Sequence, residues 1–287
     1  MSVVAEVIAH VPATCGELLQ GVDADGPVLI SMPIDQYGTV RVALTDEPGV
    51  SVTPALPHAT AALLLAIDRA EWRGGATVQL GGELPHSRGM GSSTADVAGV
   101  VHAVCSAADV SVTPEEVVAL MTQVEPSDSS PLQGLWAIDH VHGRRAMRLA
   151  AMPGAWYLAC VDSGEPAATL DVHRICGVGP HIPDDTLRAT QWRDPAAVAR
   201  VATDSALRNQ ERRPHPAFDA VHRVAQRLGA PGICVAHSGS LCAVICAGLS
   251  QAVNARGALA AEGLRADLLQ AAAPGVRVRV DRPAVVD

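Results

Sequence analysis

The stretch LPHSRGMGSSTADVAG, residues 84–99, constrains the fold more than any other part of this chain. Before it, ATVQLGG at 76–82 is typical of a β-strand, and after it small apolar residues favour a closely packed helix. The turn between them is rich in glycine and leads into Ser92, Ser93 and Thr94, which are good N-cap residues. The amides of such a turn, together with the positive end of the helix dipole, form a binding site for an anion such as phosphate.

Length and hydropathy indicate a globular protein with a substantial core. The chain has 287 residues, and 48% of them are hydrophobic, which is enough for one large domain or two modest ones. No internal repeat or low-complexity linker interrupts the sequence. We place a domain boundary near residue 150, which gives the segments 1–150 and 151–287.

The charge pattern and the N-terminus bear on partners and location. The formal charge of −9, without a run of like charges, provides no attraction to nucleic acid or to anionic lipid. The N-terminal MSVVAEVIAHVPATCGE lacks the basic and long apolar regions of a targeting segment, and no later window is apolar enough to span a membrane. The seven cysteines include no CxxC pair and indicate reduced thiols. We therefore expect a cytoplasmic protein with no nucleic-acid or membrane partner.

The chain contains no lysine, so all 21 basic residues are arginine. A Walker P-loop, a protein kinase and a pyridoxal enzyme each need a lysine amine, and these classes are excluded. If the protein handles ATP, backbone amides, hydroxyls, arginine and a divalent metal must hold the phosphates.

Periodicity places further elements on both sides of the glycine-rich turn. A helix after Thr113, with Pro114 in its first turn, leads into the loop EPSDSSP. The remaining expected elements are strands at 3–11, 28–32, 39–44, 145–149 and 155–161, helices at 60–72, 196–208 and 217–228, an irregular stretch at 177–195, and a final strand, glycine turn, strand, helix and strand from residue 232 onward.

The glycine-rich turn resembles the second signature of the GHMP kinases, in which a proline is followed by the order glycine, glycine, serine, serine. The resemblance implies a two-lobed α+β fold, with an N-terminal lobe like domain 2 of ribosomal protein S5 and a ferredoxin-like C-terminal lobe. It also implies that the loop wraps the phosphates of ATP. The residues that this implies for ATP binding are Pro85, Arg88, Gly89, Met90, Gly91, Ser92, Ser93, Thr94 and Ala95.

Further segments resemble the L-threonine kinases of cobalamin biosynthesis. These are VPATCGELLQG near the start, EPSDS at 125–129, DVHR at 171–174 and VAHSGSL at 235–241, in the order and at the spacing of that subfamily. The resemblance implies transfer of the γ-phosphate of ATP, with Mg²⁺, to the hydroxyl of L-threonine. Two alternatives stay open: a kinase for homoserine, serine or an amino alcohol, and a kinase-like sensor that binds ligand without transferring phosphate.

Two acidic residues in the EPSDSSP loop suit phosphoryl transfer, which needs charge neutralisation and alignment. Glu125 lies 34 residues beyond Gly91, across two expected antiparallel helices that would return it to the first helix start. Mg²⁺ prefers hard oxygens, and the resemblance implies Glu125 and Ser93 as its ligands, although Ser92 is an alternative. A glutamate that merely ends a helix would be disfavoured by the helix dipole.

Asp128 is our candidate catalytic base, in a loop where Ser127, Ser129 and Ser130 could orient it. The alternatives are an Asx-turn at Asp128, a base at Asp139, or transfer without any base, in which case Asp128 would only position the hydroxyl.

The substrate groups have two candidate partners. We expect Glu17 to bind the substrate ammonium and Arg174 to bind its carboxylate through two parallel donors, and a structural role stays open for each. Arg88 either helps to neutralise the charge of the phosphates or is a solvated surface residue. Cys15 is not expected to act as a nucleophile, because direct transfer to an alcohol needs no covalent intermediate.

The histidines give weaker indications. His140 and His142 lack a third metal ligand at a diagnostic spacing. His237 either contacts ligand or stabilises the turn that contains it.

Overall fold

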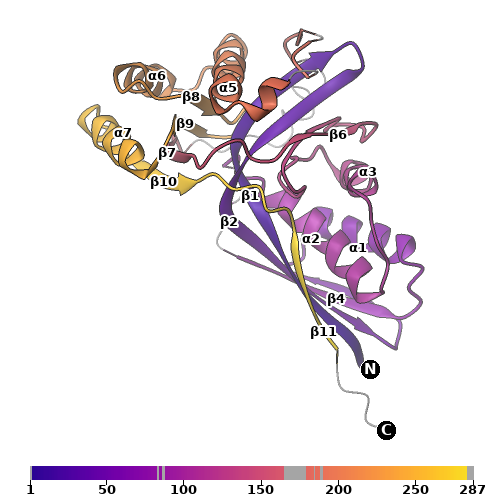
Figure 1. Ribbon diagram of the computed structural model, residues 1–287. Coiled ribbons are helices and arrows are strands. Elements are labelled where there is room, and N and C mark those ends of the chain that lie inside the picture. Colours follow the sequence, from indigo (N-terminus) through magenta and orange to yellow (C-terminus); the bar gives the residue numbers. More distant parts are fainter. Residues whose placement is uncertain are drawn as a thin grey trace.

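The computed structural model shows an α+β protein organised around one long antiparallel hairpin (Figure 1). The mixed class predicted from the sequence is confirmed. The described residues, without the side chains of residues 190 and 191, are 2–82, 84–85, 88–164, 179–183, 185–187 and 190–282.

The hairpin consists of β1 (Val3–Asp23) and β2 (Gly26–Thr45), which pair over almost their whole length. Most of their side chains are buried, because two different cores cover two different stretches of the same strands. Val42 belongs to the first core and Ile30 to the second. The hairpin therefore contributes residues to both hydrophobic cores.

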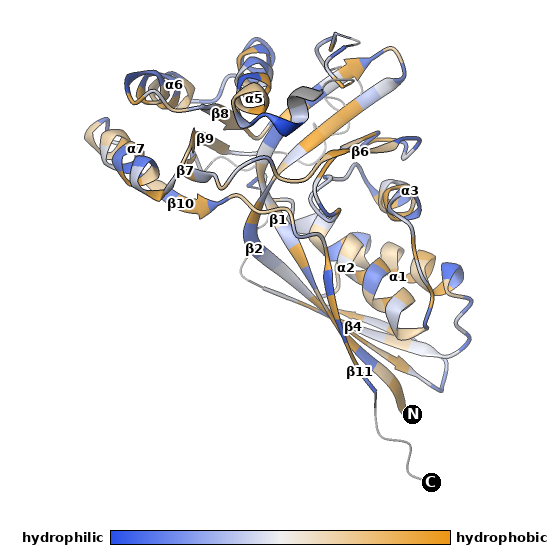
Figure 2. Cartoon of the chain, in the orientation of Figure 1, coloured by the Kyte–Doolittle hydropathy of each residue, from blue (hydrophilic) through white to orange (hydrophobic). Residues whose placement is uncertain are grey.

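The first core lies between the lower part of the hairpin and three helices (Figure 1). β4 (Gly75–Gly82) pairs with β2, and β3 (Val50–Thr53) adds a parallel edge strand. The helices are α1 (Pro57–Arg69), α2 (Ser92–Ala107) and α3 (Pro114–Val124). In Figure 2, α2 is coloured mainly hydrophobic, in keeping with its burial between the sheet and the other helices.

The second half of the chain builds a sheet that continues from β1, in the order β10-β7-β9-β8-β1. Three helices pack on this sheet and carry more hydrophilic colour than α2 does (Figure 2). The elements are β7 (Tyr157–Asp162), a short 3-10 helix η1 (Thr190–Arg193), α5 (Pro195–Gln210), α6 (Phe218–Arg227), β8 (Gly232–Val235), β9 (Leu241–Cys246), α7 (Leu249–Ala261) and β10 (Ala266–Gln270).

Three further strands, β5 (Leu135–Ile138), β6 (Ala146–Ala150) and β11 (Arg277–Asp281), connect the two halves of the molecule. β5 pairs with β2 and with β6, and β11 returns to pair with β1 beside the first core. A division into the segments 1–150 and 151–287 stays a proposal, because the hairpin and β11 connect the two regions.

The expected strand at 76–82 and the expected helix after Thr113 are confirmed. Thr113 forms a capping box with Glu116, and Pro114 lies in the first turn, as the pattern predicts. The helices expected at 60–72, 196–208 and 217–228 are also present, within a few residues of the predicted ends.

Other boundaries were wrong. The short strands expected at 3–11, 28–32 and 39–44 are parts of the long hairpin, and the strands β3 and β10 were not expected. The N-cap of α2 is also not a hydroxyl residue. Gly91 occupies that position with a φ of 68° and without a side-chain cap.

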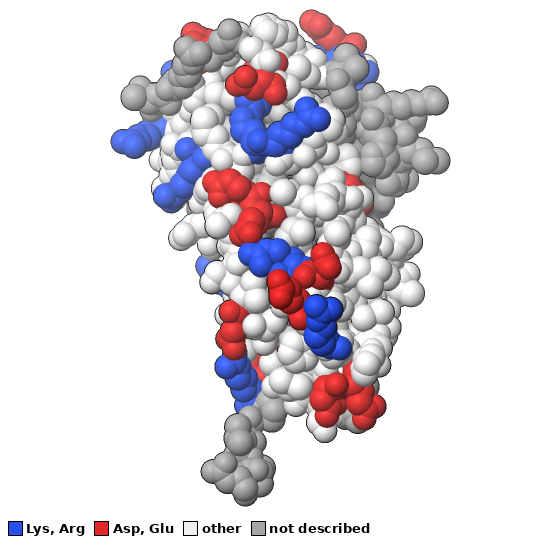
Figure 3. Space-filling model, turned by 90° about the vertical axis from the view of Figure 1, so that its right-hand side faces the viewer, with Lys and Arg blue, Asp and Glu red and all other residues white. Residues whose placement is uncertain are grey.

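Charged side chains of both signs are mixed on the face shown in Figure 3. In ion pairs such as Arg69 with Glu116, at 2.8 Å, the side chain of at least one partner is more than one third exposed. Such pairs contribute little to stability. None of the helices in the described part of the chain combines the length and the apolar character that a membrane crossing requires.

Helix α2 approaches the hairpin most closely at Gly99. A Cβ atom at this position would lie 2.4 Å from Val40 Cγ2 and 3.2 Å from Val11 Cγ2. Valine side chains are stiff, and Val40 is held by its strand. The glycine is therefore required by the distance between helix and sheet.

We expect Gly99→Ala to destabilise the protein by about 1–2 kcal/mol, because the cost of overpacking exceeds the gain in helix propensity. The matched control is Gly257→Ala in α7, where nothing lies within 4 Å of the new methyl group. That variant should be more stable than the wild type by up to about 1 kcal/mol. Urea unfolding measures both changes, and equal gains in the two variants would contradict the close contact.

Candidate active site

The glycine-rich loop forms a tight turn at the start of α2. Gly89 and Gly91 have φ values of 87° and 68°, a region that favours glycine. A Cβ atom on Gly91 would also lie 2.8 Å from Asp128 Oδ2 and 3.0 Å from Thr14 Cγ2. The loop therefore needs glycine both for its backbone conformation and because other groups approach it closely.

The loop is held from both sides by backbone hydrogen bonds. Thr14 of β1 donates its N–H to the carbonyl of Met90, at 3.1 Å. On the other side, Ser240 donates its N–H to the carbonyl of Arg88, at 3.0 Å. Ser240 belongs to the turn between β8 and β9, so both halves of the protein fix the loop.

The loop residues expected to bind ATP differ in what they can offer. Ser92 and Ser93 are half-buried in the first turn of α2, where hydroxyls and amides can face a ligand. Pro85 is exposed and Met90 is buried in the second core. The methyl group of Ala95 is in the first core, and its N–H donates to the carbonyl of Gly91.

Two other loop side chains point to protein partners. The Thr94 hydroxyl accepts the N–H of Asp128 at 3.0 Å and lies 3.5 Å from Asp128 Oδ2. Arg88 Nη1 lies 3.4 Å from Asp162 Oδ1. In this structure Thr94 therefore positions Asp128, and Arg88 pairs with a carboxylate.

Asp128 lies in the loop after α3, against the glycine-rich turn. Ser31 donates its hydroxyl to Asp128 Oδ1 at 3.2 Å. Burial raises the pKa of Asp128 to about 6, although the hydroxyls of Ser31 and Thr94 lower it. A carboxyl group with a pKa near neutrality is suited to accept a proton.

The serines beside Asp128 do not orient it directly, contrary to expectation. Ser127 donates its hydroxyl to the carbonyl of Glu125, and the hydroxyl of Ser129 accepts the N–H of Ser31. Ser31 on β2, which no sequence pattern indicated, and Thr94 at the start of α2 contact Asp128 instead.

Glu125 is the C-cap of α3. Burial is the main cause of the raised pKa of Asp128 and the hydrogen bond with Asp96 that of His58, and the charge of Glu125 adds to both. Its Oε1 atom is buried and has no hydrogen-bond partner within the described residues. An unsatisfied carboxylate oxygen is costly, and a hard cation would satisfy it. The return of Glu125 to the start of α2 stays a prediction, and its orphaned oxygen fits a hard cation such as Mg²⁺.

Glu17 lies in an irregular part of β1 and its carboxylate is buried. Gly16 before it has a φ of 68°, and a Cβ atom there would lie 2.5 Å from the carbonyl carbon of Val235. Glu17 accepts the N–H of His237 at 2.7 Å. Burial raises the pKa of Glu17 to about 8, and the negative charge of Asp128 acts in the same direction.

Buried polar side chains continue from Glu17 away from the loop. Gln20 donates its N–H to the hydroxyl of Ser205 at 3.3 Å, and its side-chain amide lies 3.4 Å from His140 Nε2. Ser205 is also 3.3 Å from His237 Nε2. Burial lowers the pKa of His140 to about 4 and that of His237 to about 3, so both imidazoles are neutral.

Asp139 has a structural role. Its Oδ1 atom accepts the N–H groups of Val141 at 3.2 Å and of His142 at 3.0 Å, as expected for an aspartate in a turn. His142 Nδ1 faces Asp139, whereas His140 faces Gln20, so the two imidazoles do not converge on one point.

Cys15 is a buried thiol whose Sγ lies 3.3 Å from Cys160 Sγ. The hydrogen bond with Cys160 lowers the pKa of Cys15, but contact with Cys234 and burial raise it, and the net pKa is well above its usual range. Such a thiol is a poor nucleophile, which agrees with the sequence-based expectation. Arg174, expected to bind a carboxylate, lies outside the described residues.

Comparison with known proteins gives a consistent result. A sequence model described as the GHMP kinases N terminal domain matches residues 57–132. The L-threonine kinase of Salmonella typhimurium is 30% identical over 246 residues, covering 82% of this chain and 81% of that protein. The L-threonine kinase of Citrobacter freundii is 29% identical over 250 residues, covering 82% of this chain and 84% of that protein.

Solved structures share the fold at low sequence identity. Homoserine kinase from Cytophaga hutchinsonii has a TM-score of 0.71 and 15% identity, covering 96% of this chain and 97% of its own. Galactokinase from Lactococcus lactis has a TM-score of 0.66 and 12% identity, covering 94% and 95%. With its glycine loop at the start of α2, its buried carboxylates and these relatives, the chain belongs to the GHMP kinase family.

Proposed function

We propose that this GHMP kinase transfers the γ-phosphate of ATP to the hydroxyl of L-threonine and forms O-phospho-L-threonine. The observation that carries the proposal is the position of Asp128, whose carboxylate lies against the glycine loop and whose negative charge acts, together with burial, to raise the pKa of Glu17. The L-threonine kinases that are similar over four fifths of the chain support this acceptor. By the same resemblance, the product would serve cobalamin biosynthesis.

The nucleotide phosphates would bind at the turn from Gly89 to Ser93. The amides of this turn and the start of α2 supply donors and positive dipole charge without any lysine. Glu125 and the hydroxyl of Ser93 would hold Mg²⁺, which neutralises phosphate charge when it is bound. ATP is a substrate in this reaction and Mg²⁺ is the cofactor.

The acceptor would lie between Asp128 and Glu17. Asp128 would accept the hydroxyl proton or align the hydroxyl, and Glu17 would pair with the substrate ammonium. Arg174 is proposed to bind the substrate carboxylate on the basis of the sequence alone.

Two alternatives are tested by the same assay. A kinase for homoserine, serine or an amino alcohol would need only a different fit around the same carboxylates. A sensor without catalytic activity is less well supported, because the chain has both Glu125 and Asp128, and Asp128 lies against the loop.

A panel of amino acids distinguishes these functions. We expect kcat/KM for L-threonine to exceed that for L-serine by about 10- to 200-fold, since one methyl group contributes about 1–3 kcal/mol in an apolar pocket. Homoserine should react poorly because its hydroxyl is displaced by one carbon. A preference for homoserine would refute the threonine assignment, and ATP binding without any phosphate transfer would favour the sensor.

Asp128→Asn should lower kcat by about 10²- to 10⁴-fold if Asp128 is the base, with little change in the KM for ATP. The amide keeps the shape of the carboxylate but cannot accept the proton. Steady-state kinetics with L-threonine measure the effect, and Asp139→Asn is the matched control that should retain more activity. A loss below about tenfold would mean that Asp128 aligns the hydroxyl without abstracting its proton.

Glu125→Gln should fail differently from Asp128→Asn. Removing a charged ligand weakens Mg²⁺ binding, so the remaining activity should require a much higher Mg²⁺ concentration. A Mg²⁺ titration of both variants compares the two roles. The assignment of Glu125 is wrong if its variant and the wild type show the same Mg²⁺ dependence.

The KM for L-threonine should fall as the pH rises from 6 to 8. The raised pKa means that Glu17 carries a proton in the free enzyme below about pH 8, and this proton must leave before the carboxylate pairs with an ammonium group. Glu17→Gln should raise the KM and remove its dependence on pH. The same pH dependence in the variant would exclude Glu17 as the ammonium partner.

A further inference from the structure

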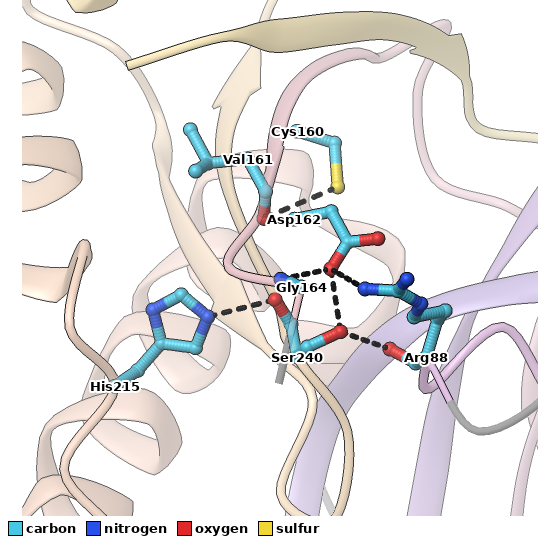
Figure 4. A network of polar contacts seen from close by, with 7 residues as sticks. All are labelled: Arg88, Cys160, Val161, Asp162, Gly164, His215 and Ser240. Carbon is cyan, nitrogen blue, oxygen red and sulfur yellow. Dashed lines mark hydrogen bonds and ion pairs between the residues drawn. The ribbon is translucent and has the colours of Figure 1, made fainter. Parts of the chain in front are cut away.

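Asp162 is the last residue of β7 and lies at the centre of a polar network beside the glycine loop (Figure 4). Its Oδ1 atom lies 2.6 Å from the hydroxyl of Ser240, 2.9 Å from the N–H nitrogen of Gly164 and 3.4 Å from Arg88 Nη1. Three donors from three separate segments therefore converge on one carboxylate oxygen.

Ser240 connects this carboxylate to the loop. Its hydroxyl has one hydrogen, and the distances of 2.6 Å to Asp162 and 3.3 Å to the Arg88 carbonyl assign that hydrogen to Asp162. The Arg88 carbonyl receives the backbone N–H of Ser240, at 3.0 Å. The serine thus binds the loop with its amide while Asp162 fixes its side chain.

The carbonyl of Ser240 is also held in place. It accepts the N–H of Ser163 at 2.9 Å and lies 2.9 Å from His215 Nε2. His215 Nδ1 accepts the N–H of Ala217, so the neutral ring carries its hydrogen on Nε2 and donates it to Ser240. The side chain, amide and carbonyl of Ser240 are therefore all constrained before any ligand binds.

The glycine preceding Ser240 brings this turn against the loop. The φ of Gly239 is outside the left-handed region, so its backbone does not require glycine. A Cβ atom on Gly239 would nevertheless lie 2.4 Å from Gly89 Cα and 2.5 Å from the Arg88 carbonyl oxygen. Direct backbone contact leaves the loop little freedom to move toward the turn.

We propose that Asp162 and Ser240 are positioning residues for the phosphates of ATP, which act by fixing Arg88 and, through it, the amides of the glycine loop. The proposal rests on the proposed nucleotide site. It gives the second half of the chain a defined part in binding ATP. It also makes Arg88 a member of this hydrogen-bond network, in which the carboxylate of Asp162 compensates the positive charge of Arg88.

The contacts in the network differ in strength. The hydroxyl of Ser240 donates to a charged oxygen over a short distance and is buried, whereas Arg88 and Asp162 are about one third exposed and 3.4 Å apart. Charge-assisted hydrogen bonds are the strong class, and exposed ion pairs contribute little. Loss of the hydroxyl should therefore matter more than loss of the charge on Asp162.

Ser240→Ala and Asp162→Ala should each raise the KM for ATP and its dissociation constant about tenfold, while kcat and the KM for L-threonine change less than about twofold. Asp162→Asn should stay within about threefold of the wild type, because its oxygen still accepts from Ser240 and Gly164. The double variant of Ser240 and Asp162 should bind ATP no more weakly than either single variant, because both remove the same bond. Calorimetric titration with Mg-ATP measures binding independently of turnover.

Two controls separate failure of this proposal from failure of the proposed function. Gly91→Val disrupts the loop itself and should abolish ATP binding in a folded protein; normal binding there would overturn the nucleotide site. Asp267→Ala removes an exposed carboxylate on the neighbouring strand β10 and should bind ATP like the wild type.

If Gly91→Val loses ATP while Ser240→Ala and Asp162→Ala bind it normally, the positioning role is refuted. Equal weakening of ATP and L-threonine binding, together with a lower melting temperature, would also refute it, because that result indicates a general structural role. If Asp162→Ala does not fold, Ser240→Ala and Asp162→Asn still decide between these outcomes.

Discussion

The pairing of β1 with β2 is the constraint on which the rest of the structure depends. A hairpin about 20 residues long on each side cannot bury both faces against one layer of helices, so successive stretches are covered by different parts of the chain. The register of the pairing shifts between Pro12 and Ala13, where the two cores meet, and again between Thr14 and Glu17. That irregular stretch places Thr14 against the loop and Glu17 against the turn at His237.

The electrostatics of the site follow from this position. Glu17 and Asp128 are both removed from water, and burial is the main cause of the raised pKa of each. Neither group is balanced by a close cation within the described residues, apart from the distant influence of Arg213 on Glu17. Groups of this kind are expected where a ligand supplies the missing charge.

The sequence predicted the local features well and the long-range ones poorly. The glycine loop and the helix starts after it and after Thr113 depend on neighbouring residues and can be recognised in a short window, although the N-cap of α2 is Gly91 and not the expected hydroxyl residue. Ser31, Asp162 and Ser240 could not be assigned in this way, because their partners lie 97, 74 and 152 residues away along the chain. The motif AHSGSL indicated a turn near the site but not its partner.

The strand lengths were underestimated for a related physical reason. Polar residues such as Thr14, Glu17 and Gln20 interrupt the apolar pattern of β1, and a local rule ends the strand before them. In the structure they are buried with partners from other segments. Tertiary contacts therefore extend β1 beyond the length that its local sequence pattern predicts. The same contacts hold the polar side chains of the candidate active site.

The contact between Gly89 and Gly239 has a consequence for how the protein is assembled. It joins parts of the chain 150 residues apart, so it can form only after a long loop has closed. The shape of the glycine loop in the structure therefore depends on the turn between β8 and β9 lying against it. A nucleotide that binds only to this loop shape stabilises only the fully folded protein. Its binding is therefore a measure of the contact between these two distant parts of the chain.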